Sequence, residues 1–144
     1  MAVREKAPAW YWVATIILLL WALLGVAAFY AQIRLTKADI DAMPAYDAAL
    51  LKSQPSWLVY DFALGTITGL VGALCLVIRS QIAMPLYLFS LIGVVIQFGW
   101  VLGATDIIAH KGLLAAAGFP LVIFVMAVFG YWLAIVARGR RWIS

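Results

Sequence analysis

Four long apolar runs dominate this chain and limit what it can fold into. They extend over Ala9 to Ile33, Trp57 to Ile78, Ala83 to Ala104 and Leu113 to Ala137. Each run is close to the roughly 20 residues that an α-helix needs to cross a hydrocarbon core of about 30 Å. The period-2 alternation of a membrane barrel strand is absent, and helices satisfy their own backbone hydrogen bonds in lipid. We therefore predict four transmembrane helices.

The composition favours lipid rather than water as the surrounding solvent. Hydrophobic residues make up 67% of the chain and charged residues 11%, against about half and a quarter in soluble domains. A soluble domain of this size leaves too much of its surface exposed to bury such an excess. The formal net charge is +4, but the basic residues lie at the ends of the apolar runs and form no single stripe, which argues against a nucleic-acid binder.

The links between the runs predict the topology. Residues 79–82 form so short a link that the second and third runs must be an antiparallel hairpin, and Pro85 suits the first turn of the incoming helix. The link at residues 105–112 is also short. We predict one all-α domain over residues 1–144, an up-down-up-down four-helix membrane bundle.

The extramembrane loop between the first two runs, residues 34–56, should contain short helices. Thr36 with Asp39 resembles a capping box, so we predict a helix from Thr36 to Met43 that stops at Pro44, and a second turn or two from Ala45 to Leu51. Apolar residues recur at near-helical spacing, which predicts an amphipathic segment on the membrane surface or a cap on the bundle. A binding lid is the alternative interpretation.

The distribution of Lys and Arg predicts the orientation. The two chain ends and the 79–82 link hold six of these residues, and the other side holds four. The first group is Arg4, Lys6, Arg79, Arg138, Arg140 and Arg141, and the second is Arg34, Lys37, Lys52 and Lys111. The positive-inside rule then predicts cytoplasmic termini. We also expect Arg138, Arg140 and Arg141 to contact anionic lipid.

The first run could instead be a secretory signal, but its apolar stretch is longer than a signal core and Phe29 occupies a position that needs a small residue. We expect it to be retained as a span. Aromatic residues at the ends of the runs are predicted interface anchors. They are Trp10, Tyr11, Trp12, Phe29, Tyr30, Trp57, Tyr60, Tyr131, Trp132 and Trp142.

Small residues indicate where helices pack closely. The second run carries a face of small and polar residues at steps of three and four, which should meet protein rather than lipid. The face comprises Asp61, Gly65, Thr68, Gly72, Cys75 and Arg79, with Gly69 beside it. The candidate helix-packing seam consists of Gly65, Gly69, Gly72, Gly99 and Gly103. It serves either packing within the chain or a homodimer. In the fourth run, Pro120 removes a backbone donor and predicts a kink.

Four polar side chains form a candidate polar path. Asp61 lies one turn inside the second span, where an ionised carboxylate costs on the order of a few kcal/mol in hydrocarbon, so we expect a partner for it. An interfacial carboxylate near a helix N-terminus is the alternative. Gln97, near mid-membrane, needs a partner on another helix. Asp106 and His110 are a candidate ion pair or proton relay at i,i+4, if the third helix continues into the loop.

The second and third spans resemble a set of small bacterial four-span inner-membrane proteins of uncharacterised activity, some of which carry the automatic label "sugar transporter". The resemblance rests on Pro55-Ser-Trp57, on Gly69-x-x-Gly72 leading to Arg79, and on Ala83, Ser90 and Gln97. These are loose glycine and aromatic spacings, and Asp61 departs from the small or apolar residue expected there. The resemblance implies a bacterial inner-membrane location and supplies no substrate or site.

The remaining residue counts exclude several chemistries. With Cys75 as the only cysteine and His110 as the only histidine, the chain has no CxxC pair and no two-histidine metal spacing. We predict no enzyme activity, cofactor or metal, because no nucleophile has a base beside it. The predicted function is a non-enzymatic accessory or assembly protein that associates with another membrane subunit or a second copy through its glycine seams. The alternative is a small oligomeric transporter or channel for a solute or protons, using the polar path.

Overall fold

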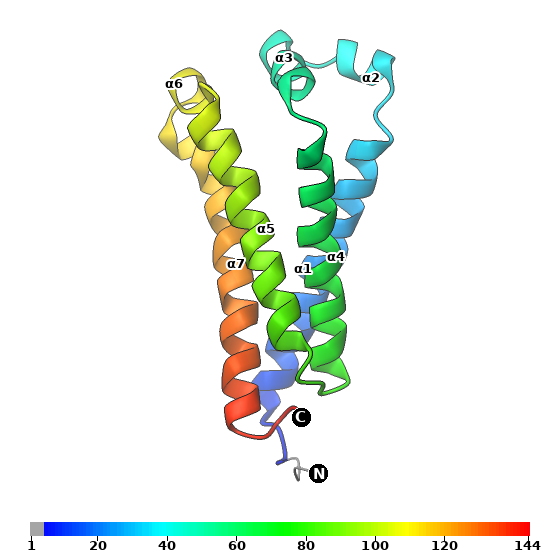
Figure 1. The fold of residues 1–144 in the computed structure, drawn as a ribbon, viewed down its shortest axis with the longest axis vertical. Coiled ribbons are helices and arrows are strands. Elements are labelled where there is room, and N and C mark those ends of the chain that lie inside the picture. Colours follow the sequence, from blue (N-terminus) through cyan, green and yellow to red (C-terminus); the bar gives the residue numbers. More distant parts are fainter. Residues whose placement is uncertain (1–4) are drawn as a thin grey trace.

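The computed structural model describes residues 5–144, and the described chain is helical with no strand. Four helices are long and apolar enough to cross a membrane (Figure 1). They are α1 (Ala9–Ile33), α4 (Trp57–Val77), α5 (Ala83–Ala104) and α7 (Leu113–Gly139). Three short helices, α2 (Lys37–Asp41), α3 (Ala45–Ser53) and α6 (Ile107–Lys111), belong to the connecting loops. The predicted all-α four-helix membrane bundle is confirmed.

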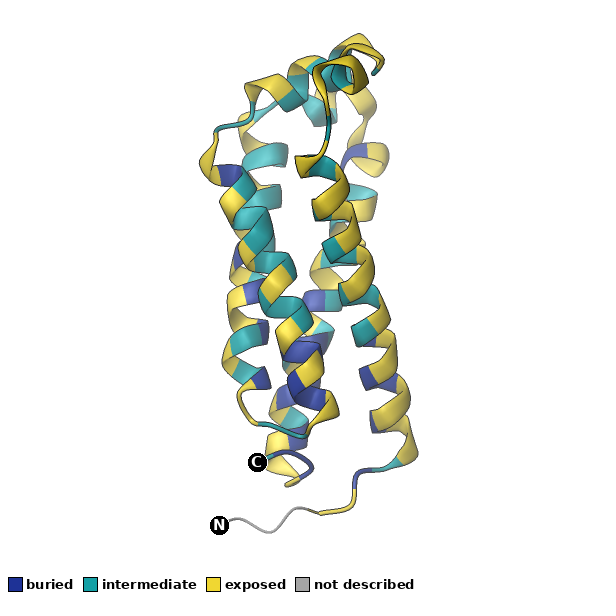
Figure 2. Ribbon diagram, turned by 90° about the vertical axis from the view of Figure 1, so that its right-hand side faces the viewer, coloured by how far each residue is buried: buried dark blue, intermediate teal, exposed yellow. Residues whose placement is uncertain are grey.

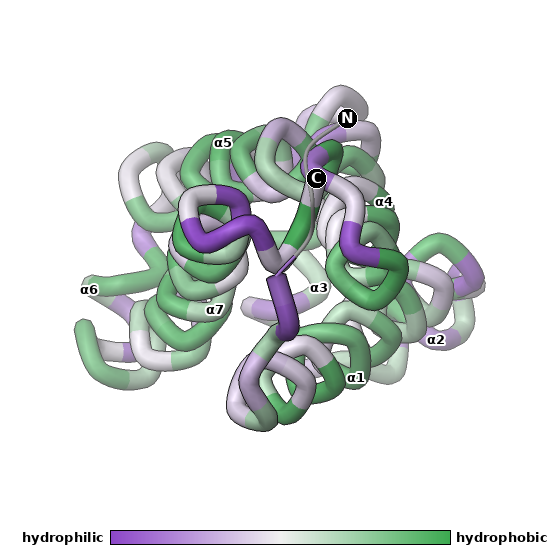
Figure 3. Tube along the Cα trace, turned by 90° about the horizontal axis from the view of Figure 1, so that it is seen from below, coloured by the Kyte–Doolittle hydropathy of each residue, from purple (hydrophilic) through white to green (hydrophobic). Residues whose placement is uncertain are grey.

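The long helices run alternately up and down, with α1 packed along α4, α4 along α5, and α5 along α7 (Figures 1 and 3). We call the end that holds Glu5, the turn at residues 78–82 and residues 140–144 the terminal end. The opposite end, which holds α2, α3 and α6, is the loop end. In Figure 1, α4 and α5 lie close together near the terminal end and diverge toward the loop end.

Packing is much tighter at the terminal end (Figure 2). The buried residues of the four long helices lie almost entirely in the half of each helix nearest that end. They fall within residues 11–18 of α1, 72–76 of α4, 83–93 of α5 and 127–137 of α7. Toward the loop end, only Leu58 of α4 and Ala116 of α7 are buried in these helices. The bundle therefore has a compact core at one end and looser helices at the other.

Two predicted interface anchors, Tyr11 and Trp142, are instead part of this core. Tyr11 has no exposed surface, and its hydroxyl donates a buried hydrogen bond to the Leu76 carbonyl at 2.6 Å. Trp142 is 6% exposed and packs edge-on against Tyr11 and Trp10. The prediction was wrong for these two residues because neighbouring helices cover them. Trp10 itself remains 46% exposed, as an interface residue can be.

Helices α4 and α7 end in the same way, each with an arginine in the left-handed conformation. Arg79 and Arg141 both have φ of 62°. After α4, the Ser80 N–H donates to the Cys75 carbonyl at 2.7 Å, and after α7 the Trp142 N–H donates to the Ala137 carbonyl at 2.8 Å. This is the Schellman pattern, which satisfies carbonyls at a helix C-terminus and usually employs glycine at the left-handed position.

The Arg79 side chain explains why an arginine occupies this position. Its Nε donates to the Trp142 carbonyl at 2.6 Å, and its guanidinium also donates to the Glu5 carbonyl. The backbone of Ser144 donates to the Arg79 carbonyl at 3.1 Å. Arg79 thus holds the segment 140–144 across the 78–82 turn. Arg4, which entered the orientation count, lies outside the described residues.

The predicted capping box at the loop end is confirmed. Thr36 Oγ1 accepts a hydrogen bond from the Asp39 N–H at 3.1 Å, and Asp39 Oδ2 accepts one from the Thr36 N–H at 2.9 Å. Helix α2 ends at Asp41, before the predicted Met43, and α3 continues to Ser53, two residues beyond the predicted Leu51.

The predicted end of the third span at Ala104 is confirmed, so the condition that would place Asp106 and His110 in line with Gly99 and Gly103, a helix continuing into the loop, is not met. Helix α5 ends at Ala104, and Thr105 has extended backbone geometry with φ of −121° and ψ of 168°. The Thr105 hydroxyl donates back to the Val101 carbonyl and accepts from the Ile107 N–H at 3.4 Å, which closes α5 and starts α6. Asp106 and His110 therefore belong to the loop between α5 and α7, outside the line of Gly99 and Gly103.

Candidate functional site

The structure divides the predicted polar path into two separate clusters. Asp61 and Gln97 meet inside the bundle, across α4 and α5. Asp106 and His110 lie at the loop end beside α3. Among residues 5–144, no hydrogen bond or ion pair joins one cluster to the other. The four side chains are therefore no continuous path in this structure.

Asp61 and Gln97 satisfy each other within the membrane-spanning region. With its amide nitrogen turned toward α4, Gln97 donates to Asp61 Oδ2 at 3.2 Å and to the Leu58 carbonyl at 3.3 Å. Both residues are half-buried. An amide that bridges a carboxyl group and a backbone carbonyl of the neighbouring helix binds the two helices together, because neither group has to remain unpaired in an apolar surrounding.

Below this pair, the small residues of α4 let its backbone approach α5. A methyl group added at Gly93 would lie 3.3 Å from the Gly65 backbone, and Ser90 Oγ donates to the Gly65 carbonyl at 2.8 Å. A methyl group at Gly69 would lie 3.2 Å from Ser90 Oγ, and one at Gly72 would lie 3.1 Å from the Tyr87 ring. The α4 glycines therefore pack within this chain.

The other glycines of the predicted seam have different surroundings. A methyl group at Gly99 or Gly103 would meet nothing within 4 Å. The same holds for Gly118 on α7, which the sequence had not suggested as a seam residue. Pro120 lies inside α7, which continues past it to Gly139.

Tyr46 organises the loop-end cluster. Its hydroxyl donates to Asp106 Oδ1 at 2.7 Å, and its ring stacks on the His110 ring with centroids 3.7 Å apart. Beside it, Lys111 Nζ lies 2.6 Å from Asp47 Oδ1. These five residues, which we call the loop-end strap, connect α3 to α6. The loop between α1 and α4 is thereby attached to the loop between α5 and α7, as the cap prediction requires.

Asp106 and His110, the candidate ion pair or proton relay, form no ion pair with each other in the described structure. Asp106 and His110 each contact Tyr46, and the two side-chain ion pairs of the described residues are Lys52 with Asp41 and Lys111 with Asp47. Desolvation raises the pKa of Tyr46 to about 12, assisted by the hydrogen bond to Asp106. Sequence reasoning missed Tyr46, because only its apolar spacing within the loop was visible. The contact with residues 60 or more positions away has no local signal.

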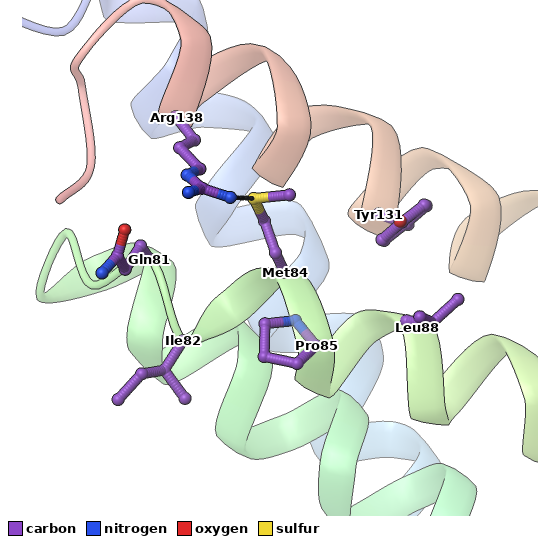
Figure 4. A pocket seen from close by; sticks show the side chains of 7 residues that line it. All are labelled: Gln81, Ile82, Met84, Pro85, Leu88, Tyr131 and Arg138. Carbon is purple, nitrogen blue, oxygen red and sulfur yellow. Dashed lines mark hydrogen bonds between the residues drawn. The ribbon is translucent and has the colours of Figure 1, made fainter.

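Two hollows lie between α5 and α7. The larger, about 630 Å³, is toward the loop end, and we call it the apolar groove. Its lining includes Phe98, Gly99, Leu102, Ala117, Gly118 and Pro120. The smaller, about 450 Å³, is at the terminal end beside Arg138, and we call it the terminal pocket (Figure 4). Neither Asp61 nor Gln97 lines either hollow.

The described residues contain no group of three or more His, Cys, Asp or Glu placed to hold a metal ion. Comparison of the chain with protein-family models, with curated proteins and with solved structures gave no match.

Proposed function

We propose that this chain is a non-enzymatic membrane accessory protein that binds a transmembrane helix of a different subunit in the apolar groove. The observation that carries the proposal is the groove itself, a hollow of about 630 Å³ with Gly99 on one wall and Gly118 on the other. No atom lies within 4 Å of a methyl group placed at either glycine. The glycine surface of α4, by contrast, is already covered by α5.

The chemistry of the groove defines the partner. In hydrocarbon, helices associate by close van der Waals packing, and small residues allow the backbones to approach. A glycine inside a helix makes the helix less stable than an alanine would, by about 1 kcal/mol. Gly99 and Gly118 both face the groove, and no contact within the chain explains the absence of a side chain there. A close contact with another helix would explain it. The lining contains no charged side chain. The matching partner is an apolar helix with small residues on the face it presents.

We further propose that the membrane is a bacterial inner membrane with the terminal end in the cytoplasm. Among the described residues, the terminal end carries Lys6, Arg79, Arg138, Arg140 and Arg141, five cations, against four at the loop end. Arg138 lies in the last turn of α7, and Arg140 and Arg141 follow the helix immediately, where the positive-inside rule gives charges most weight. The resemblance to small four-span inner-membrane proteins supports the same location.

Photocross-linking in the native membrane tests the partner. A photoreactive residue at position 118 should link the chain to a foreign membrane protein, with a defined mass. Gly99→Leu should abolish that product by filling the groove, whereas Gly103→Leu should retain it. Gly103 is the matched control, because it is one turn away on α5, is equally open, and lies outside the groove lining. Products with only a second copy of the chain, or equal loss in both variants, would contradict the proposal.

A small transporter or channel is the second candidate. It is favoured by the Asp61–Gln97 pair, a carboxyl group held within a span. Proton or solute flux into vesicles that contain the purified chain tests this function against Asp61→Asn, which keeps the shape of the side chain. Equal fluxes in the two proteins would reject a role for the carboxylate.

A further inference from the structure

The terminal pocket combines an apolar wall with a cationic edge. It lies between the start of α5 and the end of α7 (Figure 4). Ile82, the N-cap residue of α5, is followed at steps of three by Pro85 and Leu88 within the helix, so the three form one stripe on the pocket wall. Gln81 and Arg138 provide polar groups near the chain termini, and Tyr131 adds a hydroxyl beside Leu88 (Figure 4). The one charged group is that of Arg138, so a matching occupant is apolar over most of its length and anionic at one end.

Arg138 has no carboxylate partner in the described chain. Its guanidinium contacts only a weak acceptor, Met84 Sδ, at 3.7 Å (Figure 4). The two side-chain ion pairs of the described residues both lie at the loop end. Arg79, a cation on the 78–82 turn, already binds backbone carbonyls. Arg138 is thus the cation of the pocket that is free to bind an anion.

The pocket also lies at the depth expected for lipid headgroups. Tyr131 lines it, and the adjacent Trp132 is 48% exposed on the outer surface of α7. Exposed tryptophan near the end of a span marks the membrane interface. Five described cations surround this end of the bundle, and Glu5 is the one acidic side chain near them. The local charge favours an anionic ligand over a zwitterionic one.

We propose that the terminal pocket binds an anionic phospholipid. The Arg138 guanidinium binds the headgroup phosphate, for which its planar set of donors is suited. The Gln81 amide supplies a further donor. One acyl chain lies along the stripe of Ile82, Pro85 and Leu88, which covers apolar surface of both the lipid and α5. This site is independent of the apolar groove and of the partner helix proposed above.

Lipid retention by the full-length chain tests the site. The protein is purified in uncharged detergent and titrated with phosphatidylglycerol or phosphatidylcholine of identical acyl chains, and bound lipid is counted by native mass spectrometry. Phosphatidylglycerol should bind at least tenfold more tightly. Arg138→Gln should weaken its binding about tenfold, and Arg140→Gln should change it less than twofold. The sequence suggested Arg140 as a lipid contact as well, but it lies over Trp142 and does not line the pocket. It is therefore the matched control, with the same charge at the same end of the bundle.

A second variant separates the pocket from general charge. Leu88→Trp keeps every charge but fills the apolar wall, so it should weaken phosphatidylglycerol binding several-fold; unchanged helicity and melting temperature verify its fold. Soluble glycerol phosphate, which offers the same anion without acyl chains, should not displace the lipid. The proposal is overturned if Arg138→Gln and Arg140→Gln weaken binding equally, if Leu88→Trp has no effect, if phosphatidylcholine binds as tightly, or if glycerol phosphate competes.

Discussion

Gly130→Ala should destabilise the bundle by overpacking, because the added methyl group would make the closest contact of any described glycine. Gly130 lies on α7 against the buried ring of Tyr87 on α5. A methyl group there would lie 2.6 Å from Tyr87 Cδ1 and 2.8 Å from Cζ, closer than real Cβ contacts permit. The ring has no room to move away from Gly130, because its opposite edge lies close to the backbone of Gly72 on α4. A methyl group built on Gly72 would lie only 3.1 Å from the Tyr87 ring atoms Cδ2 and Cε2. Tyr87 is therefore held between two glycines on two different helices.

The size of the effect follows from two opposing contributions. Overpacking of a well-packed core costs about 1–3 kcal/mol, and alanine gains about 1 kcal/mol over glycine in helix propensity. Gly99→Ala has only the second contribution, because no atom is within 4 Å of the new methyl group. We expect Gly130→Ala to be less stable than Gly99→Ala by about 1–3 kcal/mol. The melting temperatures should differ by about 2–4 °C for each kcal/mol in a chain of this size.

Cys75 provides the assay. It is the only cysteine and is buried in the terminal core, so a thiol-reactive fluorophore reports unfolding in detergent. Adding Tyr87→Leu to the Gly130→Ala variant should restore part of the lost stability, because it removes the ring with which the new methyl group clashes. A Gly130→Ala protein that melts at or above the temperature of Gly99→Ala would refute the packing argument.

Two further predictions concern the ends of the bundle. Tyr46 ionises only near a pKa of about 12 when folded, against 10.0 for the free side chain. The stability that protonated Tyr46 contributes is therefore complete below pH 10 and is lost as the pH rises from 10 to 12. Amide hydrogen exchange in α3 should accelerate over that pH range more steeply than in the Tyr46→Phe variant. Parallel pH profiles in the two proteins would contradict this prediction. At the other end, Arg79→Gly keeps the left-handed backbone but removes the bonds to the Trp142 and Glu5 carbonyls. Trypsin should then cleave after Arg140 and Arg141 several-fold faster, and an unchanged rate would count against the clamp.

The elements that the sequence predicted well are those set by local physics. The bounds of α1 and α5 agree with the predicted runs, and those of α4 and α7 differ by one and two residues. The length of an apolar run is fixed by the thickness of the hydrocarbon core, so it is visible in one sequence. The capping box at Thr36 was predictable for a similar reason, since both hydrogen bonds join residues three positions apart. That Asp61 and Gln97 need partners followed from their depth alone.

The misses all depend on contacts between distant residues. Tyr11 bonds to the Leu76 carbonyl 65 positions away, so its place in the core could not be told from its place at a span end. The clamp by Arg79 joins it to Trp142, 63 positions away. The seam prediction named five glycines, of which three meet α5 and two meet open space. Which of these applies depends on how the helices are rotated and shifted against one another, and the glycine spacing does not determine this.

The uneven packing of the bundle has a mechanical consequence within the bilayer. A bundle with a compact core in one half and looser helices in the other will respond unequally to lateral compression, because voids shrink under pressure while a close-packed core does not. Bending, thinning or anaesthetic loading of the membrane should therefore change the shape of the loop-end half first. The loop-end strap limits how far the helices of that half can separate, because its contacts hold α3 against α6.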